Sequence, residues 1–173
     1  MIRLEPLAPE HLPLLRSLVA DPAVLRFTRI PVPPPPDFPE RWLAGYMAGR
    51  RDGTRIGFAV VDDETGEQLG MALAPTVEQD AATAELGYIV TPRARGRGVA
   101  TTALGLLTDW ALSELGAEWL ELRISVDNVA SQRVAERCGY VREGVLRSLY
   151  VKDGVREDTE IWSRLASDPP IDR

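Results

Sequence analysis

The stretch TPRARGRGVATTALGLL, residues 91–107, places three arginines and two glycines at the start of a segment with helical spacing. The first backbone N–H groups of a helix have no partner within the helix, and the helix dipole adds partial positive charge there. Glycines allow a ligand to approach this backbone closely, and arginines add formal charge around it. The stretch therefore predicts a site for a phosphate or pyrophosphate. The alternative is a turn that glycines close and arginines solvate.

Two better-known phosphate motifs do not fit this stretch. A Walker A loop ends in Gly-Lys followed by Ser or Thr, whereas Gly98 is followed by Val99 and Ala100. A dinucleotide-binding fingerprint needs a third glycine where Thr101 stands. Another phosphate compound is therefore expected.

Composition limits the partners of such a site. A chain of 173 residues can bury one sizeable core, so we expect a single domain over residues 1–173. The net charge of -6 disfavours a nucleic-acid partner, because a phosphate backbone needs many spread-out Lys and Arg side chains. One cysteine and one histidine predict neither an internal disulfide nor a zinc site.

The ends and apolar runs of the chain bear on its location. The N-terminus carries charges where a signal peptide would need an apolar run, and nowhere do eighteen apolar residues follow one another. A cytoplasmic protein with no membrane partner is the expectation.

The N-terminal half predicts a strand, two helices and then three strands that form, most simply, an antiparallel meander. These elements are a strand around Ile2 and Leu4, a helix opened by Pro9, a proline-punctuated loop over residues 21–39, a helix from Glu40 that Gly49 and Gly53 end, and strands at IGFAVVD, LGMALAPTVE and TAELGYIV.

The C-terminal half predicts helix, strand, helix and a strand hairpin. These elements are a helix from Val99 that Gly116 closes, a strand at AEWLELRISV, a helix at NVASQRVAERCG capped by Asn128 and followed by Gly139, and strands at YVREGVLRSLYV and VREDTEIWSRL joined at Asp153-Gly154. The order βααβββαβαββ predicts an α/β (α+β) fold: a mixed, mostly antiparallel sheet of about seven strands with helices on both faces.

The segment from Arg93 to Gly98 resembles the Arg/Gln-x-x-Gly-x-Gly/Ala signature of the GNAT superfamily of acetyl-CoA-dependent N-acetyltransferases, and the element order is similar along nearly the whole chain. AELGYIVTP and DNVASQRVAERCGYVREGVLR resemble the branch of the Rim-type ribosomal-protein N-terminal alanine and serine acetyltransferases. The resemblance is dense from Glu85 to Arg147 and thin before Arg55. It implies an acyltransferase that moves acetyl from acetyl-CoA, without a metal, to a protein or peptide N-terminal amine by direct transfer in a ternary complex.

The resemblance also implies which residues hold coenzyme A, the cosubstrate. The pyrophosphate would lie on the backbone from Arg95 to Thr101, the pantetheine arm along the preceding strand, and Asn128 would contact the cofactor. The implied cofactor-binding residues are Tyr88, Ile89, Val90, Arg93, Arg95, Gly96, Arg97, Gly98, Val99, Ala100, Thr101, Asn128 and Ser131.

Acetyl transfer to an amine requires a neutral nucleophile, a stabilised oxyanion and a proton for the departing thiolate. Glu85 lies on the strand just upstream of the loop, and the resemblance implies that it is the general base, directly or through water. An ordinary outward carboxylate is the alternative. A backbone N–H from residues 88–90 would meet the oxyanion. Many family members place a tyrosine acid seven residues after the asparagine, but that position here is Ala135. The resemblance to the Rim-type branch, which commonly has serine three residues after the asparagine, implies Ser131 in its place. Alternatively, Ser131 caps a backbone N–H of the first helical turn, or it does both.

Other conspicuous residues are interpreted structurally. Tyr140 is expected in the core, Cys138 as a small buried hydrophobe, and His11 in solvent. The four tryptophans are expected in the core or a groove wall: Trp42, Trp110, Trp119 and Trp162.

The acceptor and the assembly stay open at this point. A small-molecule amine, such as a polyamine, an aminoglycoside or another metabolite, is the first alternative, and the acidic composition favours cationic acceptors. Residues 21–39, the helix from Glu40 and residues 147–158 would select it. A module that binds CoA or a partner protein without turnover is the second alternative, which the missing tyrosine supports. Monomer and homodimer are both compatible with the sequence.

Overall fold

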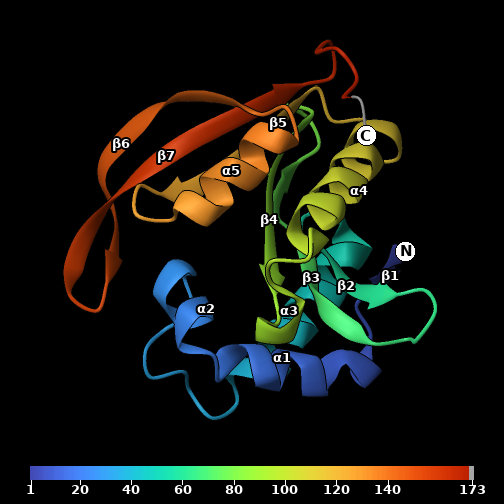
Figure 1. The fold of residues 1–173 in the computed structure, drawn as a ribbon, viewed down its shortest axis with the longest axis vertical. Helices are drawn as coiled ribbons and strands as arrows, with labels where there is room; N and C mark the ends of the chain where they lie inside the picture. Colours follow the sequence, from blue (N-terminus) through green and yellow to red (C-terminus); the bar gives the residue numbers. More distant parts are fainter. Residues whose placement is uncertain (172–173) are drawn as a thin grey trace.

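A seven-stranded sheet lies at the centre of the computed structural model, which describes residues 1–171 (Figure 1). The strand order is β1-β2-β3-β4-β5-β7-β6. The strands are β1 (Ile2–Pro6), β2 (Ile56–Asp62), β3 (Gln68–Glu78), β4 (Thr83–Val90), β5 (Trp119–Ser125), β6 (Val141–Lys152) and β7 (Val155–Leu165). All neighbours pair antiparallel except β4 and β5, which are parallel. The predicted mixed, mostly antiparallel sheet and the meander are confirmed.

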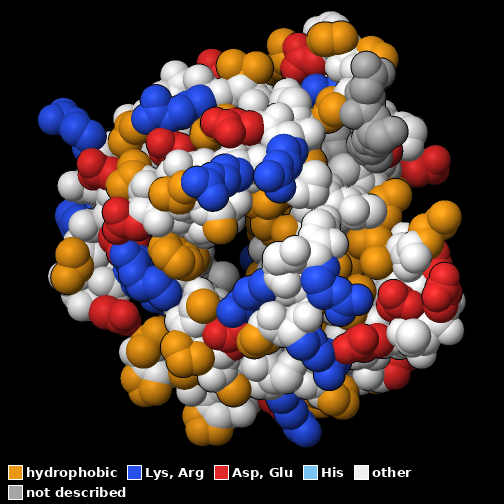
Figure 2. All heavy atoms as spheres, in the orientation of Figure 1, with side chains coloured by type: hydrophobic (Ala, Val, Ile, Leu, Met, Phe, Trp, Pro, Cys, Tyr) orange, Lys and Arg blue, Asp and Glu red, His pale blue; other side chains and the backbone are white. Residues whose placement is uncertain are grey.

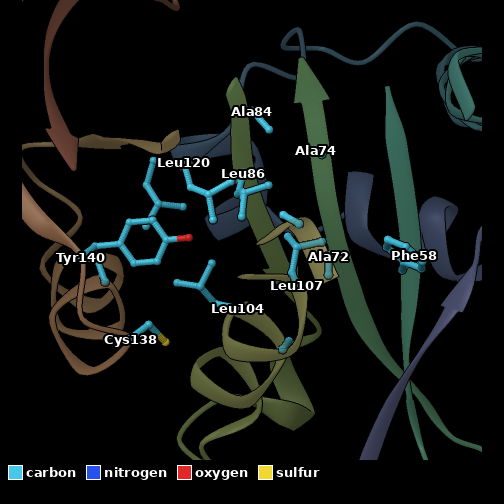
Figure 3. Packing of buried hydrophobic residues seen from close by; sticks show 14 of the residues in the cluster. Phe58, Ala72, Ala74, Ala84, Leu86, Leu104, Leu107, Leu120, Cys138 and Tyr140 are labelled. Carbon is cyan, nitrogen blue, oxygen red and sulfur yellow. The ribbon is translucent and has the colours of Figure 1, made fainter. Parts of the chain in front are cut away.

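Helices cover both faces of this sheet, as predicted. They are the short 3-10 helix η1 (Pro9–His11), α1 (Leu12–Val19), α2 (Pro22–Phe27), α3 (Phe38–Asp52), the 3-10 turn η2 (Pro92–Ala94), α4 (Val99–Ser113) and α5 (Val129–Arg137). Alternate residues of β3 show the two faces, because Ala72 packs in the core beneath α4 whereas Met71 packs in the core beneath α1 and α3. Figure 3 shows the first core, with Leu104 and Leu107 of α4 facing β4 and β3.

Two connections have the geometry that their sequences predict. The parallel pair β4 and β5 is joined through α4, because parallel strands need a crossover. The β6–β7 hairpin turns at Asp153 and Gly154, whose φ angles of 50° and 77° fit the two-residue turn that Asp-Gly favours.

Three details differ from the sequence-based expectation. Residues 21–39 are not a loop throughout, since α2 begins after Asp21, whose carboxylate accepts from the Ala23 N–H at 2.9 Å. Gly49 lies inside α3, which ends only at Gly53, where φ is 71°. Pro9 begins a 3-10 turn rather than the α-helix, and this turn buries the side chain of its last residue.

That side chain is His11, which is 2% exposed and not in solvent as expected. Its Nδ1 accepts from the Ala8 N–H at 3.0 Å, so it closes the turn that precedes α1. The remaining structural interpretations are confirmed for Tyr140 and Cys138, both buried in the core shown in Figure 3. The Tyr140 hydroxyl lies 2.8 Å from that of Thr108.

The tryptophans also lie where the sequence places them. Trp162 is buried, Trp110 and Trp42 pack against the two cores, and Trp119 lines a cavity beside β4. Within residues 1–171, no helix is both long enough and apolar enough to span a membrane.

Candidate active site

Strands β4 and β5 pair over only three residues and then separate. Thr83, Ala84 and Glu85 pair with residues 119–121, and β4 continues to Val90 without β5. Figure 1 shows the result: α5 and the β6–β7 hairpin, in orange and red, lie to one side of β4, and α4 lies to the other. Residues 86–90 therefore present an edge within the sheet that no strand from residues 1–171 covers.

The register of β3 decides which groups face this free edge. The Thr91 N–H donates to the Leu69 carbonyl at 2.9 Å. Because backbone groups alternate along an antiparallel ladder, Ile89 directs its N–H and C=O to β3, whereas Tyr88 and Val90 direct theirs to the free edge. The Val90 carbonyl there accepts from Arg95 Nη2 at 3.2 Å. Of the three residues expected beside a pantetheine arm, Tyr88 and Val90 therefore offer backbone groups to it, and Ile89 does not.

The glycine and arginine stretch forms a loop at the end of this edge. Gly96 and Gly98 have φ angles of 71° and 78°, and Gly98 is the N-cap of α4. An added Cβ would meet nothing within 4 Å at either glycine, so the left-handed backbone, and not crowding, requires them. In the described part of the chain, the N–H groups of residues 96–101 make no hydrogen bond, and the first turn of α4 holds no acidic side chain. Free N–H groups and the helix dipole make this loop fit an anion.

The three arginines of the loop do not act as one cluster. Arg93 pairs with Glu67 at 2.6 Å, and Arg95 pairs with Asp21 as well as with the Val90 carbonyl. Arg97 is exposed and has no ion pair or hydrogen bond with any residue from 1 to 171. Arg97 is thus the guanidinium that is available to a phosphate.

Helix α5 brings Asn128 and Ser131 to the opposite side of the free edge. The Asn128 carboxamide oxygen accepts from the Ser131 N–H at 3.2 Å, so the predicted N-cap is confirmed and Ser131 is not itself the capping residue. The Tyr88 hydroxyl reaches across from β4 and donates to the Ser131 carbonyl at 3.3 Å, and burial raises the pKa of this hydroxyl. A side-chain hydrogen bond with Ser131 lowers the pKa of the Tyr88 hydroxyl by less than burial raises it, so the two hydroxyls lie beside each other. Ala135, at the position of the family's tyrosine acid, is buried in the core.

Glu85 stands at the point where the two strands separate, on the face opposite α4. Its side chain is 11% exposed and pairs with Arg29, which comes from the segment after α2. Arg123 of β5 lies 3.7 Å away through its Nε atom. Tyr150 of β6 joins these two cations, because the Arg29 guanidinium stacks on its ring at 4.5 Å and Arg123 donates to its hydroxyl at 3.0 Å.

A cavity opens beside this cluster, and its walls are strand residues. It is lined by Thr76, Glu78, Thr83, Ala84, Glu85, Trp119, Glu121 and Arg123. Figure 2 also shows a hollow near the centre of the displayed face, at the place between α5, α2 and β4 in Figure 1, with Lys and Arg side chains in blue around its rim. Hydrogen bonds to Tyr150 and Glu121 raise the pKa of Arg123, so this guanidinium remains a fixed cation of the site.

Sequence patterns do not indicate Arg29, Arg123 and Tyr150 as parts of this site, nor the side chain of Tyr88. Arg123 and Glu121 share one face of β5, but their position opposite Glu85 depends on the parallel register with β4. Arg29 lies in a segment without helical or strand periodicity, 56 residues from Glu85 in the chain.

Comparisons with known proteins agree with this geometry. A model of the acetyltransferase (GNAT) domain matches residues 2–141. The Bacillus subtilis (strain 168) protein named Probable N-acetyltransferase YjcK is 34% identical over 86 residues, which are 50% of this chain and 48% of that protein. The chain spans about half to two thirds of the length of the curated relatives it matches.

Two solved structures share the fold across nearly the whole chain. RimL, a ribosomal L7/L12 alpha-N-protein acetyltransferase in complex with coenzyme A, superposes with a TM-score of 0.87 at 19% identity, over 95% of this chain and 93% of that one. The Vibrio cholerae spermidine N-acetyltransferase in complex with CoA and spermine superposes with a TM-score of 0.84 at 21% identity, over 96% of each chain. The family model, which covers well over half of the sequence, identifies this chain as a member of the GNAT acetyltransferase family.

Proposed function

We propose that this protein transfers the acetyl group of acetyl-CoA to a primary amine, with a protein or peptide N-terminus as the acceptor. One observation carries the proposal: an uncovered strand edge leads directly into a loop of free N–H groups, with a carboxylate at the other end of that edge. A guest that suits this arrangement is long, has amide groups at one end and has phosphates at the other. Acetyl-CoA has this form.

The binding part of the proposal uses groups that the fold leaves available. The pantetheine amides would pair with Tyr88 and Val90 as an added strand would. The N–H groups of residues 96–101 and the Arg97 guanidinium would hold the pyrophosphate. Arg93 and Arg95 support the loop through their ion pairs.

The chemical part assigns one role to each group that borders the free edge. The acceptor nitrogen attacks the thioester carbonyl, forms the C–N bond and passes its proton to Glu85, directly or through water. A backbone N–H on the free edge, from Tyr88 or Val90, stabilises the oxyanion. The C–S bond then breaks, and the thiolate takes the hydroxyl proton of Ser131, which takes a proton from water in turn, while Glu85 releases to water the proton it accepted.

A small polyamine is the second acceptor that a specific observation favours. Glu78, Glu85 and Glu121 line one cavity, and carboxylates suit an acceptor with several ammonium groups. Both acceptor types occur among similar proteins, since the solved structures include the ribosomal-protein enzyme and the spermidine enzyme described above.

The test is a turnover assay with purified protein and acetyl-CoA. The acceptors are peptides that start with Ala or Ser, spermidine, spermine and an aminoglycoside, and the readouts are free CoA and the mass of the acetylated product. We expect product from the peptides. If no acceptor of the panel leads to release of CoA, the result contradicts a transferase. Calorimetric titration with CoA then tests whether the chain is a module that binds CoA without turnover.

A further inference from the structure

Arg29 covers the solvent side of Glu85, the candidate general base. Its Nη2 atom donates to Glu85 Oε1. The Glu85 side chain is 11% exposed, whereas that of Arg29 is 50% exposed, so the guanidinium lies on the solvent side of the carboxylate. An amine that gives its proton to Glu85 must therefore come close to the place where Arg29 now lies.

The two cations beside Glu85 differ in how firmly they are held. Arg123 belongs to β5 and donates to Glu121 at 2.5 Å and to the Tyr150 hydroxyl at 3.0 Å. Arg29 has its ion pair with Glu85 and its stacking on the Tyr150 ring. Half of the Arg29 side chain is exposed, so solvent screens its ion pair and can hydrate the guanidinium when it leaves Glu85. Arg29 is therefore the cation that an acceptor can displace, and Arg123 is the one that stays.

The backbone around Arg29 keeps the displaced side chain near the site. Lys152 of β6 donates to the Thr28 carbonyl at 3.0 Å and to the Ile30 carbonyl at 2.6 Å. These bonds fix the residues on both sides of Arg29 to the β6–β7 hairpin. Displacement then needs only a rotation of the Arg29 side chain, which leaves its guanidinium beside the acceptor.

We propose that Arg29 sets acceptor specificity: the reacting amine replaces it at Glu85, and the displaced guanidinium then requires an oxygen atom from the acceptor. The proposal rests on the transfer function proposed above. A peptide α-amine supplies such an oxygen in the carbonyl of its first residue. An alkyl polyamine has no hydrogen-bond acceptor oxygen, and it brings further positive charge next to Arg29 and Arg123. Arg29 thereby favours peptide N-termini over polyamines.

Other charges of the cavity do not remove this preference. Glu121 is already paired with Arg123, and Glu78 lies at the cavity wall, two residues beyond Thr76, which pairs with Glu85. Glu78 can receive a second ammonium but cannot satisfy a displaced guanidinium at Glu85, because it stands diagonally from that carboxylate on the neighbouring strand. The charge balance at Glu85 itself is decided by Arg29 and Arg123.

The test compares a Ser-starting peptide amide with spermidine in wild type and in Arg29→Gln. The substitution should lower KM for spermidine about two- to fivefold, raise KM for the peptide by a similar factor and leave kcat within about twofold, as the loss of one partly exposed ion pair or one hydrogen bond implies. Arg29→Lys keeps the charge and should remain near wild type. Arg3→Gln is the matched control, because it removes a similarly exposed arginine of β1 that pairs with Asp63 at 3.1 Å.

Binding of the two amines in the presence of CoA gives a readout that does not need turnover. The ratio of the two calorimetric Kd values should shift in Arg29→Gln in the same direction as the KM ratio, while the Kd of CoA stays constant and shows that the variant is folded. An unchanged Kd ratio, or a loss of kcat for both acceptors at constant KM, would overturn the specificity role. Absence of turnover with an altered Kd ratio would instead contradict the transfer function alone.

Discussion

Glu85 of β4 and Glu121 of β5 are the last residues that the two strands pair before they separate. Their carboxylates share one guanidinium, since Arg123 Nε lies 2.5 Å from Glu121 and 3.7 Å from Glu85. The shared cation allows two acidic side chains to stand opposite each other where β4 leaves its neighbour. The free edge begins directly beyond this pair, so the candidate base is placed by the same feature that exposes the strand.

The proton-transfer role of Glu85 predicts a selective loss in Glu85→Gln. The amide keeps the shape of the side chain but cannot accept the proton of the amine, so kcat/KM for transfer should fall about 10²-fold or more. The pH–rate profile should lose the limb that reports an ionised carboxylate. Stopped assays across a pH series measure both effects, and the calorimetric Kd of CoA should stay within about twofold of wild type.

Glu121→Gln is the control for this prediction, because Glu121 contacts the same Arg123 from the opposite strand. It should leave the pH–rate profile unchanged. If Glu85→Gln and Glu121→Gln give the same profile, Glu85 acts only through its charge.

The hydroxyl of Ser131, which lies beside that of Tyr88, leads to a second prediction. Ser131→Ala leaves the Asn128 cap in place, because that cap uses the backbone N–H of residue 131. We expect kcat to fall about 10²-fold through loss of the proton donor, with little change in the Kd of CoA or in the melting temperature.

Ser113→Ala serves as its control, since Ser113 is an exposed serine near the end of α4 whose hydroxyl donates to the Asp109 carbonyl at 2.8 Å. Initial rates and thermal melts of both variants provide the comparison. If Ser131→Ala keeps the wild-type kcat, water or another group supplies the proton to the thiolate.

The left-handed backbone at Gly98 predicts a binding defect that can be separated from strain. Alanine at a φ of 78° costs about 1–2 kcal/mol of folding stability, and its Cβ would meet no atom of the protein. This Cβ would instead lie where the loop would bind a phosphate. Gly98→Ala should therefore weaken CoA binding at least about tenfold in calorimetric titration, because it removes the close approach to the backbone.

Gly66 supplies the matched substitution, with a φ of 72° in the turn between β2 and β3 and nothing within 4 Å of an added Cβ. Gly66→Ala should lose a similar amount of stability in urea unfolding and bind CoA as wild type does. Equal affinity in the two variants would mean that the loop does not hold the cofactor.

Local chemistry explains which parts of the fold the sequence predicts. TAELGYIV matches β4 from Thr83 to Val90, because its alternation and the flanking turn residues act within the segment. Asp153-Gly154 specifies its hairpin through backbone preferences alone. Asn128 and the glycine loop are likewise recognised from residues that lie next to each other in the chain.

Sequence patterns do not reveal features that depend on contacts between residues far apart in the chain. Helix α2 has six residues, too few for a periodic signal, although Asp21 and Pro22 mark its start. His11 is buried because a 3-10 turn changes the direction of its side chain before α1 begins. The Arg29–Glu85 contact joins a segment without periodicity to a strand, and only tertiary packing brings them together.

The carboxylate of Asp62 predicts how folding stability depends on pH. It accepts from the Thr65 N–H and hydroxyl and from the Glu64 N–H in the turn between β2 and β3, and these bonds hold its pKa below the ordinary value of 3.8. Because the pKa is lower in the folded state, its contribution to stability is present above pH 3.8 and is lost as the pH falls through the folded value.

Asp62→Ala should therefore unfold at a lower urea concentration than wild type at neutral pH, and the difference should shrink as the pH is lowered below 3.8. Urea titrations at several pH values at which wild type still folds measure this difference. Asp80→Ala is the control, since this exposed carboxylate makes no hydrogen bond or ion pair in the part of the chain described, and its difference from wild type should not converge with pH. If the difference in unfolding urea concentration between Asp62→Ala and wild type stays constant down to the lowest pH at which wild type folds, the turn does not depend on the ionised carboxylate.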